Sequence, residues 1–141
     1  MQPTAIKIKK TMAKRDKAGI YIDAQLLLQL LYDAQFEMDK RDRAVLSVRM
    51  LSHAESIISN FALAYNTDDK IEHINKMLAH FEVIKVEIRF AIDRGMFKKP
   101  STIAKARELI VKMEEGIAKW RAYIVSTRQD QHTGGADRMK I

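Results

Sequence analysis

Three side chains of kinds that bind metals or move protons are spaced seven residues apart. They are His73, His80 and Glu87, and this spacing places them on one face of a helix. Seven residues span about 10.5 Å along a helix axis, which is too far for a single metal ion with ligand bonds of about 2.1 Å. The sequence also lacks the Glu-x-x-His pairs of di-iron bundles. We therefore predict no metal site and interpret both histidines as surface or helix-seam residues.

Residues 65–69 read YNTDD, which is superficially similar to the tyrosine and paired aspartates of a reverse-transcriptase active site. The spacing has one residue too many, and the polymerase motif requires a strand hairpin. Helix capping by Thr67 or Asp68 is the simpler interpretation. His53 accompanies no serine or cysteine nucleophile in a recognisable pattern, and no glycine-rich phosphate loop is present. We predict no catalytic residue, no cofactor and no small-molecule substrate, and hence no enzyme.

Positive charge is concentrated at the start of the chain. Lysine and arginine number 25 against 18 acidic residues, a formal net charge of +7. Residues 1–17 hold six of the basic residues and one aspartate, a net +5. Such a segment is expected to be flexible in isolation and can bind nucleic acid or anionic lipid by neutralising phosphates; the alternative is a solubilising tail. Its candidate nucleic-acid-binding residues are Lys7, Lys9, Lys10, Lys14, Arg15 and Lys17.

Further cations gather near two expected turns. One group lies at the start of the second expected helix. The other lies at the end of the third helix and in the following turn, where cations complement the helix C-terminus. Phosphate contact and simple solvation are both open for these groups. On the last helix, by contrast, lysines alternate with glutamates at favourable spacing and form a self-neutralised face. The additional candidates for nucleic-acid binding are Arg41, Arg43, Arg49, Lys85, Arg89, Arg94, Lys98 and Lys99.

Apolar periodicity predicts the elements that carry these charges. Apolar residues recur at alternating steps of three and four from Ser101 to about Arg128, which predicts a long helix with a heptad seam. Similar patterns predict helices over 23–38, 46–64 and 71–95. We expect Asp23 and Ser101 to be N-caps, and Gly95 to follow a helix C-terminus. Trp120 lies on the seam, so core packing is favoured over stacking on a base.

Four helices with short links predict an all-α fold, an antiparallel up-and-down four-helix bundle. We expect the bundle to span residues 20–128. A basic flexible arm, residues 1–19, precedes it, and a disordered tail containing two adjacent glycines, residues 129–141, follows it.

The first expected helix is apolar on more than one side, which is typical of a helix covered by its own bundle and by a neighbouring subunit. No apolar run approaches the roughly 20 residues of a membrane span, and lysines interrupt the N-terminus. The chain has no cysteine, which is compatible with a reducing compartment. We expect a cytoplasmic homo-oligomer without a membrane partner. The expected interface residues are Leu26, Leu28, Leu30 and Tyr32.

Three segments resemble the accessory variability determinant proteins of diversity-generating retroelements, which share a four-helix superfamily with the 23S rRNA intervening-sequence proteins. Residues 86–93 (VEIRFAID) are similar to that family's leucine/arginine-rich third helix, and residues 113–120 (MEEGIAKW) to the following one. The helix over 40–66 is similar in register and charge, so the resemblance covers roughly residues 38–126. The family often has glycine just before the tryptophan, whereas this chain has Ala118-Lys119, with Gly116 further upstream.

The resemblance implies a non-enzymatic partner protein. Members of the family assemble as homopentameric barrels with basic surfaces, bind nucleic acid and associate with the reverse transcriptase of the element. The resemblance therefore implies that the partners are a reverse transcriptase and its template RNA, and that the complex makes mutagenised complementary DNA. The basic N-terminal arm has no counterpart in this resemblance.

Two alternatives are open on the sequence. One is a stand-alone nucleic-acid-binding protein of the intervening-sequence type, with no reverse transcriptase. The other is a structural oligomerisation module whose basic arm docks to a protein or a membrane. A reverse-transcriptase gene and a repeated template region beside this gene would distinguish the retroelement role from the first alternative.

Overall fold

The computed structural model describes the backbone of residues 2–139 and the side chains of residues 17–127. Within that range the chain is helical, without a strand. The order is α1 (Gln2–Ala34), a 3₁₀ turn (Gln35–Glu37), α2 (Lys40–Asp42), a π-helical turn (Arg43–Ser47), α3 (Val48–Tyr65), α4 (Lys70–Asp93) and α5 (Pro100–Met139). Because α2, the π turn and α3 follow one another directly, they form one rod. The prediction of an all-α chain with four helices is confirmed.

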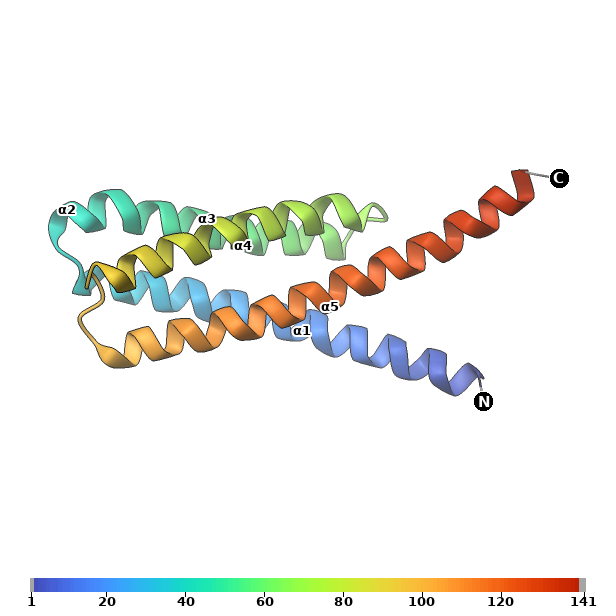
Figure 1. The fold of residues 1–141 in the computed structure, drawn as a ribbon, viewed down its shortest axis with the longest axis horizontal. Helices are drawn as coiled ribbons and strands as arrows, with labels where there is room; N and C mark the ends of the chain where they lie inside the picture. Colours follow the sequence, from blue (N-terminus) through green and yellow to red (C-terminus); the bar gives the residue numbers. More distant parts are fainter. Residues whose placement is uncertain (1, 140–141) are drawn as a thin grey trace.

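The connections lie at the two ends of the bundle (Figure 1). The α1–α2 and α4–α5 connections lie at one end, which we call the loop end. The α3–α4 loop lies at the other end, and both chain termini point away on that side (Figure 1). Helix α1 packs on α3 and α5, and α4 packs on the same two helices. The four rods therefore enclose one core.

The core is a continuous set of apolar side chains from all four rods. In α5 the buried positions include Ala106, Met113, Ile117 and Trp120, as the heptad seam predicts. Trp120 is fully buried, which confirms its predicted place in the core. Gly116 lets α1 and α5 approach closely, because a Cβ there would lie 3.0 Å from Cγ1 of Ile20.

The boundaries of the first and last helices differ from those predicted. Helix α1 begins at Gln2 rather than at the expected N-cap Asp23, and it ends at Ala34 rather than Met38. The early segment consists mainly of good helix formers, with proline near its first turn, where proline is tolerated. Helix α5 continues to Met139 instead of ending near Arg128. The side chains of residues 1–16 and 128–141 lie outside the described residues, so the arm and the tail stay predictions.

The turn after α4 is the one that the sequence predicted. Gly95 has a φ of +67°, a left-handed conformation that glycine adopts without steric cost. The amide of Met96 donates a hydrogen bond of 2.9 Å to the carbonyl oxygen of Ala91, which closes a Schellman-type helix end. The expectation of a capping glycine is therefore confirmed.

The caps that were predicted from nearby residues are not formed. Helix α4 follows Asp69, whose side chain makes no capping hydrogen bond. Helix α5 starts at Pro100, so Ser101 lies inside the first turn instead of before it. A carboxylate from the α1–α2 connection serves the start of α5 instead: Glu37 accepts 2.8 Å from the amide of Lys99 and 2.7 Å from the hydroxyl of Thr102. This long-range cap joins the two connections at the loop end and also suits the positive end of the helix dipole.

Candidate nucleic-acid interface

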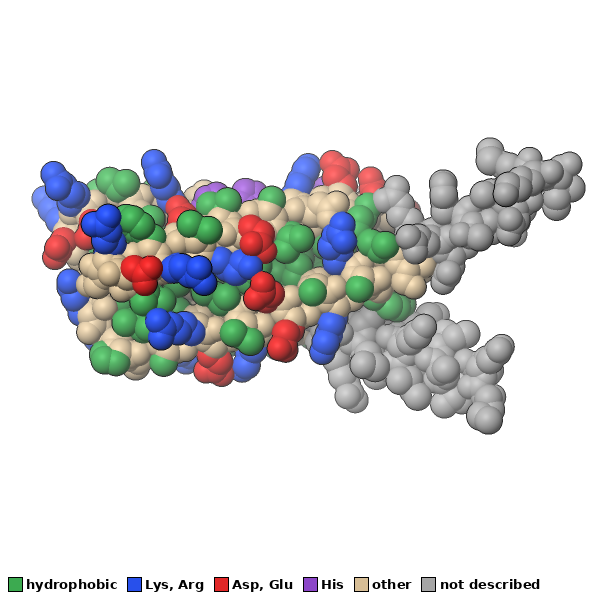
Figure 2. Space-filling model, viewed as in Figure 1, with side chains coloured by type: hydrophobic (Ala, Val, Ile, Leu, Met, Phe, Trp, Pro, Cys, Tyr) green, Lys and Arg blue, Asp and Glu red, His purple; other side chains and the backbone are tan. Residues whose placement is uncertain are grey.

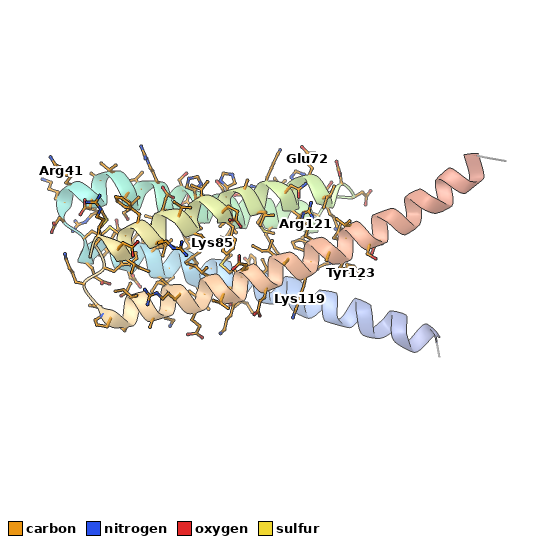
Figure 3. The ribbon with its side chains drawn as sticks, viewed as in Figure 1. Arg41, Glu72, Lys85, Lys119, Arg121 and Tyr123 are labelled. Carbon is orange, nitrogen blue, oxygen red and sulfur yellow. The ribbon has the colours of Figure 1, made fainter. Side chains whose placement is uncertain are left out.

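The loop end brings together two groups of predicted phosphate ligands that are far apart in sequence. Arg41 and Arg43 come from the start of the second rod, and Arg94, Lys98 and Lys99 from the α4–α5 connection. Figure 3 places Arg41 at this end, and the Glu37 contacts described above hold the two connections together. Acidic residues, including Glu37, lie among these cations, so the positive charge of the loop end is partly offset.

Several of these cations also fix the backbone of the turns. The guanidinium of Arg43 donates to the carbonyl oxygens of Gln35, at 3.0 Å, and Met38, at 3.4 Å, and lies 5.5 Å from the ring centre of Phe36. The amino group of Lys98 donates 3.0 Å to the carbonyl oxygen of Gly95. These two side chains therefore have a structural role whether or not they also contact phosphate.

Lys85 lies in a different place, on the face formed by α4 and α5 (Figure 3). Its amino group is 2.9 Å from a carboxylate oxygen of Glu82 and 2.9 Å from one of Glu114 on α5. The hydrogen bond to Glu114 is the main reason that the pKa of Lys85 is raised. Two carboxylates already neutralise this lysine, which makes it an interhelical tie and a poor phosphate ligand.

A groove of about 870 Å³ runs beside this tie, between α4 and α5. Its lining includes Val86, Ile92 and Val111 together with both acidic and basic side chains. Figure 2 shows red and blue side chains interspersed over this face. Arg89 lines the groove, as do the acidic residues Glu82, Asp93 and Glu114. The mixed charge makes the groove a weaker candidate for a polyanion than the basic arm.

The arm lies at the opposite end from the loop-end cations. Its backbone forms the first turns of α1, which extend past the α3–α4 loop (Figure 1). The side chains of five candidates lie outside the described residues: Lys7, Lys9, Lys10, Lys14 and Arg15. Lys17 is described, and its amino group lies 5.9 Å from the ring centre of Tyr65 and 5.8 Å from that of Trp120. The predicted basic residues are thus distributed over both ends of the bundle and one lateral face.

The four expected interface residues on α1 do not behave alike. Leu26 and Tyr32 expose 39% and 56% of their surface, whereas Leu28 and Leu30 are partly buried against the bundle's own core. Ile22 is a further exposed apolar residue on α1. Leu26 and Tyr32 are therefore the two members of this set that stay exposed on the single chain.

One cluster was missed by sequence reasoning, because its members are brought together across helices. Nδ1 of His53 on α3 lies 3.0 Å from Nδ1 of His80 on α4, and Nε2 of His53 lies 3.8 Å from a carboxylate oxygen of Glu87. The spacing of His80 and Glu87 was visible in the sequence, but the approach of His53, 27 residues earlier, was not. Among the described residues no group of three such side chains is arranged to hold a metal ion.

Burial shifts the pKa values of two groups in this cluster, His80 and Glu87. Burial lowers the pKa of His80, and the charge of His53 lowers it further. Burial also raises the pKa of Glu87, against the opposing charges of His53 and Arg49. With one proton shared between the facing Nδ1 atoms, the pair forms a hydrogen bond; with a proton on each, the two atoms repel.

We expect acidification to destabilise the bundle through His80. Its folded pKa is below the unfolded value of 6.5, so the unfolded chain binds more protons and stability is lost as the pH falls through 6.5. Glu87 acts in the opposite sense, since a raised pKa gives stability below 4.5 that is lost as the pH rises. The urea midpoint should fall between about pH 7.5 and 5.5, and His80→Gln should reduce that fall. A fall of equal size in the parent and in His80→Gln would contradict this assignment.

No helix in the described part of the chain combines the length and apolarity needed to cross a bilayer. Comparison of the chain with protein-family models, with curated proteins and with solved structures gives no match.

Proposed function

We propose that this chain is a non-catalytic nucleic-acid-binding protein, built as an up-and-down antiparallel four-helix bundle. The observation that carries the proposal is the concentration of six basic residues against one aspartate in residues 1–17, on the part of α1 that extends from the bundle (Figure 1). A projecting basic helix can follow a phosphate backbone and release its counterions. The antiparallel arrangement of the helices is supported by their connections, which lie at alternate ends of the bundle (Figure 1).

The proposal extends to a role and a partner through the family resemblance alone. In that role the chain is an accessory protein of a diversity-generating retroelement, and it binds template RNA and the reverse transcriptase during mutagenic complementary-DNA synthesis. A reverse-transcriptase gene and a repeated template region next to this gene are the expected observation. If both are missing, the stand-alone intervening-sequence type of protein is favoured instead.

The proposal also includes self-association, with a homopentamer as the form implied by the resemblance. Exposed apolar residues on α1, above all Leu26 and Tyr32, support a covering partner on that helix. A structural oligomerisation module without nucleic-acid binding is the second candidate, because the same exposed residues support it equally well. Binding measurements distinguish the two candidates.

We expect the full-length protein to bind RNA and DNA with little sequence preference and a steep dependence on salt. If all six basic residues of the arm contact phosphates, the affinity should fall by about 10³-fold between roughly 50 and 200 mM salt. Fluorescence anisotropy with a labelled oligouridylate and with a mixed-sequence duplex measures both affinities. A parent protein that binds neither probe at about 50 mM salt would overturn the proposed function and leave the oligomerisation module.

A further inference from the structure

A cleft of about 820 Å³ lies at the end of the bundle from which the basic arm extends. Its walls come from two helices, with Lys17 and Tyr21 on α1 and Phe61 and Tyr65 on α3. The neighbouring Ala18, Ala62 and Asn66 complete the lining. We call this feature the tyrosine cleft. The lining thus combines three aromatic rings with small alanine side chains.

The rings of the tyrosine cleft form a connected aromatic surface. Phe61 is the floor, with 7% of its surface exposed, while Tyr21 and Tyr65 expose 40% and 58%. The ring of Tyr65 lies nearly parallel to that of Phe61, at 6.2 Å and 19°, and the ring of Tyr21 lies 5.4 Å from that of Phe61, tilted by 36°. Phe61 in turn packs on the buried Trp120, at 5.3 Å. Both tyrosines thus contact Phe61 of the core and remain exposed to solvent.

Positive charge lies at the α1 wall of the tyrosine cleft. The amino group of Lys17 is within 6 Å of two ring centres, those of Tyr65 and Trp120, which is cation–π distance. The same helix carries the rest of the basic arm in the turns just before Lys17. On the α3 side, Asp68 and Asp69 follow in the loop, and the amino group of Lys70 donates hydrogen bonds to the carbonyl oxygens of Ala64, at 2.9 Å, and Tyr65, at 3.2 Å. The excess of positive charge lies along α1, so we expect a bound anion there, with its uncharged part over the tyrosines.

We propose that the tyrosine cleft binds a base of single-stranded nucleic acid. The base stacks on Tyr65, with Tyr21 on the opposite wall, and a flanking phosphate lies near Lys17. Stacking on aromatic side chains is how many proteins hold single strands without sequence preference. Bases within a duplex are already stacked on each other and do not offer their faces. This inference rests on the proposed function and adds to it a preference for single strands.

The test compares three variants with the parent, using a labelled oligouridylate and a duplex as probes. Tyr65→Ala should weaken binding of the oligouridylate about ten-fold, as loss of one stacked base does, and should leave both duplex binding and the salt dependence unchanged. Tyr65→Phe keeps the ring and should bind like the parent. Phe90→Ala is the matched control, because Phe90 is 46% exposed, with the Arg94 guanidinium 5.2 Å from its ring centre, but belongs to α4.

A second measurement locates the base directly. Photocrosslinking of the parent with a 4-thiouridine-containing oligouridylate should attach the label to the tyrosine cleft, as mapped by mass spectrometry. If Tyr65→Ala binds the single strand as tightly as the parent, or if the crosslink maps only elsewhere, the tyrosine cleft does not bind the base. Salt-dependent binding by the parent would still support the proposed function. A parent that binds no probe would overturn the proposed function and this site together. Equal weakening of duplex and single strand would also exclude stacking.

Discussion

Replacing Lys7, Lys9, Lys10 and Lys14 together with glutamine should weaken nucleic-acid binding roughly hundred-fold at about 0.1 M salt. Each phosphate contact contributes about −0.7 to the log–log salt slope for single strands. Losing four contacts should therefore flatten the slope by about 2.8, and the affinity at moderate salt should fall with it. Anisotropy titrations at several salt concentrations measure both quantities. The bundle should keep its helical content, because its apolar seams are unchanged.

The matched control removes the same number of charges from other surfaces of the bundle. Lys76 and Lys112 are exposed and pair with glutamates one helical turn away, and Lys105 and Lys119 are exposed on α5. Glutamine at these four positions changes the net charge equally and should leave affinity and slope close to those of the parent. If both quadruple variants lose nucleic-acid affinity by the same factor, the net charge of the protein determines binding and the arm has no special role.

Leu26→Glu and Tyr32→Glu should each reduce the mass of the assembled protein towards that of the 16.3 kDa monomer. A carboxylate introduced at a covered apolar contact would have to lose its hydration, which opposes association. Both side chains are already exposed in the single chain, at 39% and 56%, so folding should be little affected. Light scattering combined with circular dichroism separates loss of assembly from loss of fold.

Leu63→Glu serves as the control for this pair. Leu63 is 52% exposed on α3, so the substitution has the same chemistry on another helix, and the oligomer should persist. A monomeric parent would refute self-association altogether, whereas a parent-like mass in both α1 variants would place the interface elsewhere.

Helices and their buried faces could be predicted because both follow from local periodicity. The heptad spacing of α5 places Met113 and Trp120 in the core, and the position of Gly95 marks a helix end that requires a left-handed residue. The predicted start of α1 was wrong for a related reason. A possible N-cap such as Asp23 does not end a helix that good helix formers continue on its other side.

Pairings between distant residues could not be predicted from periodicity. Glu37 serves the start of α5 from more than sixty residues away, and Lys85 finds Glu114 on another helix. His53 meets His80 only because α3 and α4 lie side by side. Each of these contacts depends on the rotation of one helix relative to its neighbour, which a single sequence does not specify. The same holds for the tyrosine cleft, whose walls are two separate helices.

The position of both chain ends on one side of the bundle gives the molecule a direction (Figure 1). If copies associate side by side through α1, all of their arms emerge around a single rim, and the loop-end cations form the opposite rim. Such an assembly would be a ring whose two faces differ. A nucleic-acid strand would approach the face that carries the arms and the tyrosine clefts, which leaves the other face accessible to a protein partner at the same time.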